Sequence, residues 1–262
     1  MADPNLQLNS QLLKCAENGD LAGVERLLAQ GVDPRNNNSA PLSSAAKNGH
    51  AECVQLLIPV SDPKHSDCLA LEDAARNGHA ECVKMLIPVS DPKARDSKPL
   101  CYAADNGHAE CIKLLIHVYD PKADDSMALC LAAYNGHAEC VELLIPVSDP
   151  KADNSHALRC AAGEGHVECA KLLIPLSGPL LYNQKALAAV FAGDSAEILS
   201  LMLAAEPLLL SDGVLESLLS SANLMKRPSL ASFLSSIVEQ EALAANLPDP
   251  EASARPSLSR RL

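Results

Sequence analysis

Histidine, glutamate and cysteine recur together in this chain, in the phrase His-Ala-Glu-Cys that begins at His50, His79, His108 and His137. A looser copy, His-Val-Glu-Cys, begins at His166. A His and a Cys three positions apart lie on one face of a helix, and both side chains are zinc ligands. One zinc site, however, needs about four ligands that converge on a point. The distance between the copies therefore decides whether the phrase could bind a metal.

Successive copies of this phrase begin 29 residues apart, as 79 − 50 and 108 − 79 show. The tripeptide Asp-Pro-Lys keeps the same step at Asp62, Asp91, Asp120 and Asp149. A fixed period of about 20 to 50 residues indicates stacked supersecondary units, each of which contacts its neighbours. Stacking separates the His and Cys pairs along the array, so we expect no metal and no cofactor.

The recurring His and Cys have structural interpretations in such a stack. The first unit and a late unit place Asp20 and Asp194 where the others have His. Asp is a good helix N-cap, so we interpret the His as the residue that opens a helix. The Cys of the copies are Cys53, Cys82, Cys111, Cys140 and Cys169. They fall inside an apolar helical pattern, so we interpret them as buried free thiols in a reducing compartment.

Composition and motifs exclude several classes of function. The formal net charge is −12, whereas nucleic-acid binding depends on Lys and Arg that neutralise phosphates. The chain lacks an apolar run of about 18 residues and a secretory signal pattern, so we expect neither membrane insertion nor Sec export. Phosphate-binding loops, zinc-helix motifs and nucleophile elbows are also absent from the sequence, so we expect no enzyme.

Residues 120–148 illustrate the expected unit. A polar turn leads into a short helix from Met127 to Asn135, in which apolar residues recur at helical spacing. Gly136 suits the left-handed conformation that ends a helix. His137 opens a second helix, and Pro146 ends it. Each unit is therefore predicted to be a helix, a tight turn, a second helix and a loop.

The repeated phrase Ala-Ala-x-Asn-Gly-His-x-Glu-x-Val-x-Leu-Leu resembles the two-helix core of the ankyrin repeat. Residues 98–104, Lys-Pro-Leu-Cys-Tyr-Ala-Ala, resemble that family's Thr-Pro-Leu-His-x-Ala-Ala opening. The resemblance extends over residues 3–205, and the near-identity of the copies is similar to bacterial ankyrin arrays. It implies a mainly α solenoid of about seven or eight stacked helix-turn-helix units.

Two departures from the family qualify this resemblance. The unit has 29 residues instead of the usual 33 or so, and the deficit falls where the family forms a β-hairpin finger. We therefore expect short or absent fingers. The Thr and His of the family's opening motif are also replaced in this chain, so their hydrogen bonds must be absent or rebuilt.

We divide the chain into four regions. Residues 1–34 are expected to form an N-terminal capping repeat and residues 35–178 five ankyrin-like repeats. Residues 179–246 are expected to form degenerate repeats that cap the C-terminal end. Residues 247–262 are expected to be a flexible tail. The segment Glu239-Gln240-Glu241, together with Arg255, Arg260 and Arg261 of the tail, resembles export signals of translocated bacterial effectors, with an ordinary disordered end as the alternative.

Positions that vary between otherwise copied units identify the candidate binding residues, because the copies share whatever stacking requires. In ankyrin-like stacks these positions line the concave groove. The candidates are Lys47, Glu72, Asp73, Arg76, Lys98, Tyr102, Asp105, Met127, Tyr134, His156 and Arg159. Tyr102, Tyr134 and Met127 are the expected anchors, since Tyr supplies contact area at low entropic cost. The alternative is drift on a solvated surface.

The function we infer from the sequence is protein–protein interaction through the concave groove, as an adaptor or as a bacterial effector that engages a host protein. One alternative is an inhibitor or immunity-type partner of a bacterial protein. Another is an enzyme that uses the divergent region after Leu180. We expect a monomer in the bacterial cytoplasm, or inside a host cell if the protein is an effector.

Overall fold

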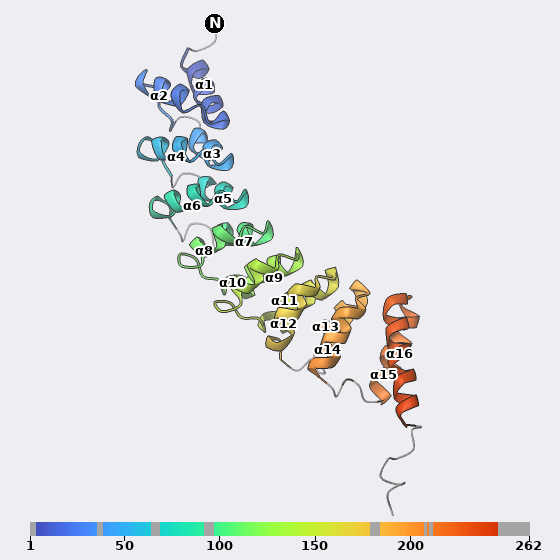
Figure 1. Cartoon of the computed structure of the whole chain (residues 1–262). Coiled ribbons are helices and arrows are strands. Elements are labelled where there is room, and N and C mark those ends of the chain that lie inside the picture. The colour runs from blue at the N-terminus through green and yellow to red at the C-terminus, as the bar shows by residue number, and fades with distance from the viewer. Residues whose placement is uncertain are drawn as a thin grey trace, which may run out of the picture.

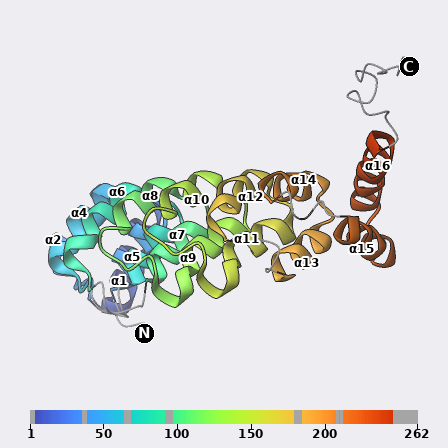
Figure 2. The ribbon, with the colours of Figure 1, turned by 90° about the horizontal axis from the view of Figure 1, so that it is seen from below.

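Helices pair into hairpins, and the hairpins stack into a curved array (Figures 1 and 2). The structure, a computed structural model, describes residues 4–35, 39–63, 69–91, 97–178, 184–206, 209 and 212–245. Within these ranges there are eight helix pairs and no β-strand. The predicted solenoid of helix pairs is therefore confirmed, whereas the tail expected at residues 247–262 lies outside the described ranges.

The helices form two rows. The first helices of the pairs are α1 (Pro4–Asn18), α3 (Ala40–Lys47), α5 (Leu69–Arg76), α7 (Lys98–Asp105), α9 (Ala123–Tyr134), α11 (Ala152–Glu164), α13 (Gln184–Gly193) and α15 (Asp212–Leu224). The second helices are α2 (Leu21–Ala29), α4 (Ala51–Leu57), α6 (Ala80–Leu86), α8 (Ala109–Leu115), α10 (Ala138–Leu144), α12 (Val167–Leu173), α14 (Ala196–Ala205) and α16 (Pro228–Ala245). Short 3-10 turns follow three of them, namely η1 (Ile58–Val60), η3 (Ile87–Val89) and η4 (Ile174–Leu176). From α1 to α13 the first helices lie on the inside of the curve and the second helices on the outside (Figure 1).

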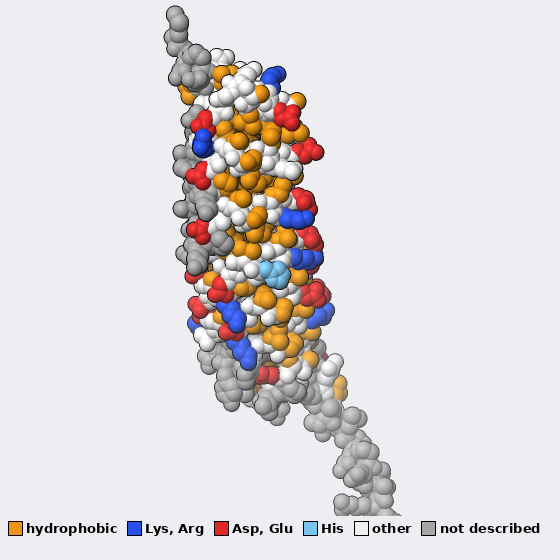
Figure 3. Space-filling model, turned by 90° about the vertical axis from the view of Figure 1, so that its left-hand side faces the viewer, with side chains coloured by type: hydrophobic (Ala, Val, Ile, Leu, Met, Phe, Trp, Pro, Cys, Tyr) orange, Lys and Arg blue, Asp and Glu red, His pale blue; other side chains and the backbone are white. Residues whose placement is uncertain are grey.

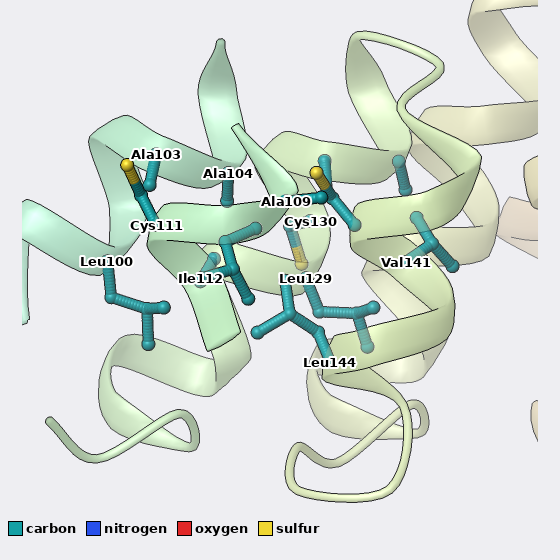
Figure 4. Close-up of a cluster of buried hydrophobic side chains, with 14 of the residues drawn as sticks. Leu100, Ala103, Ala104, Ala109, Cys111, Ile112, Leu129, Cys130, Val141 and Leu144 are labelled. Atoms are coloured by element: carbon teal, nitrogen blue, oxygen red, sulfur yellow. The ribbon is translucent and has the colours of Figure 1, made fainter. Parts of the chain in front are cut away.

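Small and medium apolar side chains form a thin core between the two rows. Leu100, Ala103 and Ala104 of α7 face Cys111 and Ile112 of α8 (Figure 4), and all five are fully buried. Burying a side chain the size of Leu or Ile contributes about 1.5 to 3 kcal/mol, so many thin layers replace one central core. The absence of Trp from the sequence fits these narrow layers.

The recurring cysteines belong to this core, as predicted. They are free and 0–1% exposed. Burial raises the pKa of the Cys111 thiol to about 11, and Cys82, Cys140 and Cys169 are raised to a similar pKa for the same reason. These thiols are therefore protonated at neutral pH and act as small apolar side chains.

Glycine ends the first helix of a typical unit. In the first inner unit, Gly49 has φ +77°, and its N–H donates to the carbonyl of Ala46 at 3.3 Å. The N–H of His50 donates to the carbonyl of Ala45 at 3.0 Å. These two bonds are the Schellman arrangement, in which a left-handed residue satisfies the last helical carbonyls. The predicted helix end at Asn-Gly is confirmed.

Each recurring His bridges two neighbouring units. It occupies the N-cap position of its second helix, as predicted, but its side chain does not cap that helix. Instead Nε2 donates to a carbonyl of the preceding unit, at 2.9–3.0 Å. The accepting carbonyls belong to Glu17, Lys47, Arg76, Asp105 and Tyr134.

The glycine of the preceding unit makes room for that ring. A Cβ added to Gly107 would lie 2.7 Å from Nδ1 of His137, which is closer than real Cβ contacts allow. A Cβ added to Gly19, Gly49, Gly78 or Gly136 would likewise lie 2.5–2.6 Å from Nδ1 of the histidine in the next unit. The Asn-Gly-His phrase thus combines a helix end with a contact between units.

The two units that have Asp in place of His use it differently. Asp20 caps α2 by accepting from the N–H of Gly23 at 3.0 Å, as the sequence suggests. Asp194 does not cap α14, because Ser195 takes that role. Its carboxylate accepts instead from the N–H of Leu230 at 3.2 Å, at the start of α16. This contact supports our proposal that residues 179–246 cap the stack.

The fingers that the structure describes contain left-handed turns in place of strands. At the N-terminal end of α9 the chain is kinked, and Asp124, Asp125 and Ser126 have φ between +49° and +62°. Residues 153–155 repeat this conformation at the N-terminal end of α11. Each such residue costs about 1 to 2 kcal/mol when it is not glycine, so compensating contacts are required. The hydroxyl of Ser126, which is 1% exposed, accepts from the N–H of Asp149 at 2.9 Å.

The serines at the end of the finger form a column. Ser39, Ser97, Ser126 and Ser155 are buried and have positive φ. Ser39 bonds the backbone of Asp62 and Ser97 that of Asp120, in each case at the start of the following unit, and Ser155 bonds that of Ser177 at the end of its own unit. These backbone contacts therefore stabilise the left-handed turn.

Arg159 compensates the turn at residues 153–155 from within the same unit. Its guanidinium donates to the carbonyls of Asp153 and Asn154 and to the Asp153 carboxylate at 3.1 Å. These bonds hold the pKa of Asp153 below its ordinary value. Arg159, which the sequence suggests as a binding residue, is therefore engaged with its own finger.

A pair of glycine substitutions tests the ring contact. Gly107 and Gly165 share nearly the same φ, +76° and +77°, but only Gly107 faces a histidine ring. Gly165→Ala should cost about 1 to 2 kcal/mol of unfolding free energy through backbone strain alone. Gly107→Ala should cost about 1 kcal/mol more, because the His137 bond is also disturbed. Urea unfolding measures both, and equal losses would show that the ring contact contributes nothing.

The pH dependence of the finger tests the Arg159 contact. Because the folded pKa of Asp153 is depressed, its contribution should be complete above the unfolded pKa of about 3.9 and disappear as pH falls through the folded value. Arg159→Ala should lower the Tm at pH 6, and the difference from wild type should shrink below pH 4. An Asp153 pKa by NMR that stays depressed in Arg159→Ala would contradict this assignment.

Candidate functional site

All eleven candidate residues lie on first helices, on the inside of the curve. Lys47 is on α3; Glu72, Asp73 and Arg76 are on α5; Lys98, Tyr102 and Asp105 are on α7; Met127 and Tyr134 are on α9; His156 and Arg159 are on α11. We call the surface of these helices the inner face. The structure thus brings together on one side residues that are separated by more than a hundred positions in the sequence.

Four candidates form a row at the ends of successive helices. Lys47, Arg76, Asp105 and Tyr134 are the last residues of α3, α5, α7 and α9. Their carbonyls are the ones that accept the next unit's His Nε2. The histidine contact therefore uses only the backbone at these positions, which explains why a cation, an anion and an aromatic ring can all occupy them. We call this set the terminal row.

Aromatic and basic side chains meet in the middle of the inner face. The Arg76 guanidinium lies over the Tyr102 ring, 3.8 Å from the ring centroid. This cation–π contact joins α5 to α7 and contributes about 0.5 to 1 kcal/mol at an exposed site. Tyr134 and Met127 of the next unit are 49% and 38% exposed. An exposed apolar and aromatic surface with a basic neighbour is therefore present here.

Two candidates do not fit the exposed role that the sequence suggests. Glu72 is 3% exposed, so its carboxylate is not presented to a partner. The side chain of Arg159 is 17% exposed, because it binds the finger of its own unit. Helical periodicity identified the correct helices for both residues. It did not reveal which contacts each side chain makes.

Three acidic or titratable candidates have intramolecular partners. Burial raises the pKa of Asp73, with Arg76 and Lys47 opposing the shift. The Asp105 carboxylate accepts from Nδ2 of Asn135 in the next unit at 2.9 Å, and Nδ1 of His156 lies 3.7 Å from Asp153. The exposed candidates with few internal contacts are Lys47, Lys98, Met127 and Tyr134, whereas Tyr102 is half-buried beneath the exposed Arg76.

Thiols on the same helices do not form a nucleophilic site. Burial raises the pKa of Cys101 to about 11 and that of Cys130 to about 12. A nucleophilic cysteine needs a lowered pKa, because the thiolate is the reactive form.

The sequence interpretation overlooked two groups of residues. One is the serine column of the fingers, which the 29-residue step of Ser97, Ser126 and Ser155 could have revealed. The other is Asn135 and its equivalents Asn48, Asn77 and Asn106, whose side-chain amides bond the carbonyl four residues earlier. Both groups bond to backbone atoms, the asparagines at the ends of the first helices and the serines in the fingers.

Comparisons with known proteins agree with this architecture. The family model for ankyrin repeats (3 copies) matches residues 12–96 and again residues 100–186. The crystal structure of the human ASB11 ankyrin repeat domain is similar in fold, with a TM-score of 0.64 and 24% sequence identity. The match covers 73% of this chain and 96% of that one. No curated protein sequence matches the chain.

In the described ranges, no helix is both long and apolar enough to cross a bilayer. The two family matches together cover 172 residues (85 + 87), about two thirds of the 262-residue chain. With its stacked helix pairs, Asn-Gly-His turns and shortened fingers, the chain belongs to the ankyrin-repeat family, whose repeats form protein–protein interaction modules.

Proposed function

We propose that the inner face binds a segment of another protein, with Tyr102, Tyr134 and Met127 as anchors. The observation that carries the proposal is the terminal row, whose backbone serves stacking while its side chains differ from unit to unit. Because the histidine contact does not depend on these side chains, they can vary to fit a ligand. The sequence contains only four Tyr, and two of them lie on this face.

The chemistry of the inner face suits a partner with both apolar and acidic groups. Tyr102 and Tyr134 supply large contact areas, and tyrosine is one of the residue types enriched at binding hot spots. Lys47 and Arg76 are exposed on adjacent units and would attract carboxylates. Arg76 stacks on Tyr102, so a partner carboxylate bound to Arg76 would lie beside the aromatic anchor.

We further propose that the partner is a host protein and that this chain is a translocated bacterial effector acting as a monomer. The support is the near-identity of successive copies, which is similar to bacterial ankyrin arrays. In that case the effector's partner would be found in the host cell lysate and not in the bacterial one. Sedimentation of the purified chain tests the monomer.

Affinity capture with a double variant tests the proposed inner-face site. Tyr102→Ala with Tyr134→Ala should lower capture of the specific partner at least tenfold, since truncating a hot-spot aromatic costs about 2 kcal/mol or more. The matched control is Gln55→Ala with Lys84→Ala, which changes exposed residues of the second helices α4 and α6.

Both variants must show wild-type helix content and urea unfolding before capture is compared by quantitative mass spectrometry. Any partner enriched by wild type and by the control, but lost with the tyrosine variant, is then titrated against the purified proteins. Equal affinity for wild type and the tyrosine variant would reject the inner face as the binding site.

A further inference from the structure

The outer face of the stack, formed by the second helices, carries a continuous apolar stripe. Figure 3 shows hydrophobic side chains running along this face from one unit to the next. One residue of each unit follows its second helix at the same register, namely Val60, Val89, Val118, Val147 and Leu176. We call these residues the outer ladder. Val60 and Leu176 are 40% and 37% exposed, and the other three are half-buried.

Stacking of the units does not account for the exposed part of this ladder. The core beneath it is already closed by leucines such as Leu57 and Leu86, which are 0% exposed. The prolines beside the ladder, at positions 59, 88, 146 and 175, are exposed as well. Exposed apolar residues arranged in one contiguous stripe indicate an interaction surface, whereas scattered ones do not.

Neighbouring exposed positions on the same helices behave differently. Positions 55, 84, 113, 142 and 171 are also exposed and hold Gln, Lys, Lys, Glu and Lys. The ladder positions hold only Val or Leu. A varying polar row therefore runs beside a uniformly apolar one. Packing of Val89 and Val118 against the core accounts for part of this difference, and a repeated ligand contact would explain the part that is exposed.

Carboxylates outline both margins of the stripe. On one margin Glu52, Glu81, Glu110, Glu139 and Glu168 are exposed in the first turns of the second helices. On the finger margin Asp62, Asp91, Asp120 and Asp149 are exposed. Lys113 pairs with Glu110 and Glu139, and Lys171 pairs with Glu168. The five helices α4, α6, α8, α10 and α12 nevertheless carry six Glu against three Lys, so the margin stays acidic. Acidic side chains are visible on both sides of the stripe in Figure 3.

A partner helix laid along the ladder could present one apolar residue to each unit. Packed helices lie about 8 to 10 Å apart, and the spacing is widest on the outside of a curved stack. An α-helix rises 1.5 Å per residue, so seven residues span about 10.5 Å. A helix with an apolar residue at every seventh position would therefore place one such residue on each unit's rung.

We propose that the outer ladder binds an amphipathic helix of a partner protein, with apolar residues at heptad spacing and Lys or Arg on both flanks. The apolar seam contacts the ladder, and the basic flanks contact the two carboxylate margins. This site is separate from the inner face, so the two surfaces can bind different segments at the same time.

A synthetic helix tests the proposal directly. The probe is a fluorescein-labelled 28-residue peptide with Leu at every seventh position, Leu or Ala completing the seam, Lys on the flanks and Gln elsewhere. The comparison peptide has the same composition in scrambled order. Fluorescence anisotropy with the full chain should show binding of the heptad peptide at least tenfold tighter than of the scrambled one, weakening as salt rises.

Two kinds of variant locate the binding site. Val89→Lys with Val147→Lys should lower the affinity for the heptad peptide at least tenfold. Tyr102→Ala with Tyr134→Ala should leave that affinity unchanged. Because the valines are half-buried, Glu52→Lys with Glu81→Lys provides a second variant that changes only exposed residues. It should lower the affinity for the Lys-flanked peptide and raise the affinity for a peptide that has the same apolar residues but Glu on its flanks.

Several results would overturn the proposal. Equal binding of heptad and scrambled peptides would mean attraction by charge alone. Unchanged binding in both outer-face variants would place the peptide elsewhere. A concentration-dependent dimer abolished by Val89→Lys with Val147→Lys would make a second copy of the chain the occupant. Binding to anionic vesicles that these substitutions remove would make a lipid surface the occupant.

Discussion

The contact between the histidine of one unit and the glycine and carbonyl of the preceding unit sets the geometry of the whole array. The ring fits only where no Cβ projects, and its Nε2 reaches a helix-terminal carbonyl at 2.9–3.0 Å. Both partners are fixed by backbone geometry, since glycine supplies the left-handed turn that exposes them. The recurring His-x-x-Cys phrase suggests metal binding in the sequence, but in the structure its histidine determines how one helix pair packs on the preceding one.

This way of docking separates stability from recognition. Because the ring recognises a carbonyl and not a side chain, the residue that carries the carbonyl can be Lys, Arg, Asp or Tyr without loss of the contact. The serine column works by the same principle, bonding backbone atoms. The stack can thus keep one geometry while its inner face changes chemically from unit to unit, which is what a family of binding modules requires.

The sequence predicted those features that depend on residues within one unit. Helix ends at Asn-Gly and the stop before Pro146 follow from local rules, and the structure places them as expected. The sequence did not predict contacts in which a side chain bonds to another unit or to the finger of its own unit. The burial of Glu72, the bonds of Arg159 and the bridge made by His137 depend on packing, which helical periodicity does not describe.

The end of the array shows what happens when the histidine is missing. At the last fully repeated step, Gly193 brings α13 so near to α11 that a Cβ there would meet the Ala162 carbonyl. The next residue, Asp194, has a carboxylate in place of the ring, and a carboxylate cannot donate to a carbonyl of the preceding unit. It accepts instead from the N–H of Leu230 at the start of α16, where the helix dipole favours a negative charge. Replacing a donor by an acceptor therefore turns the contact from the preceding unit to the following one, and the regular step of the stack ends at that residue.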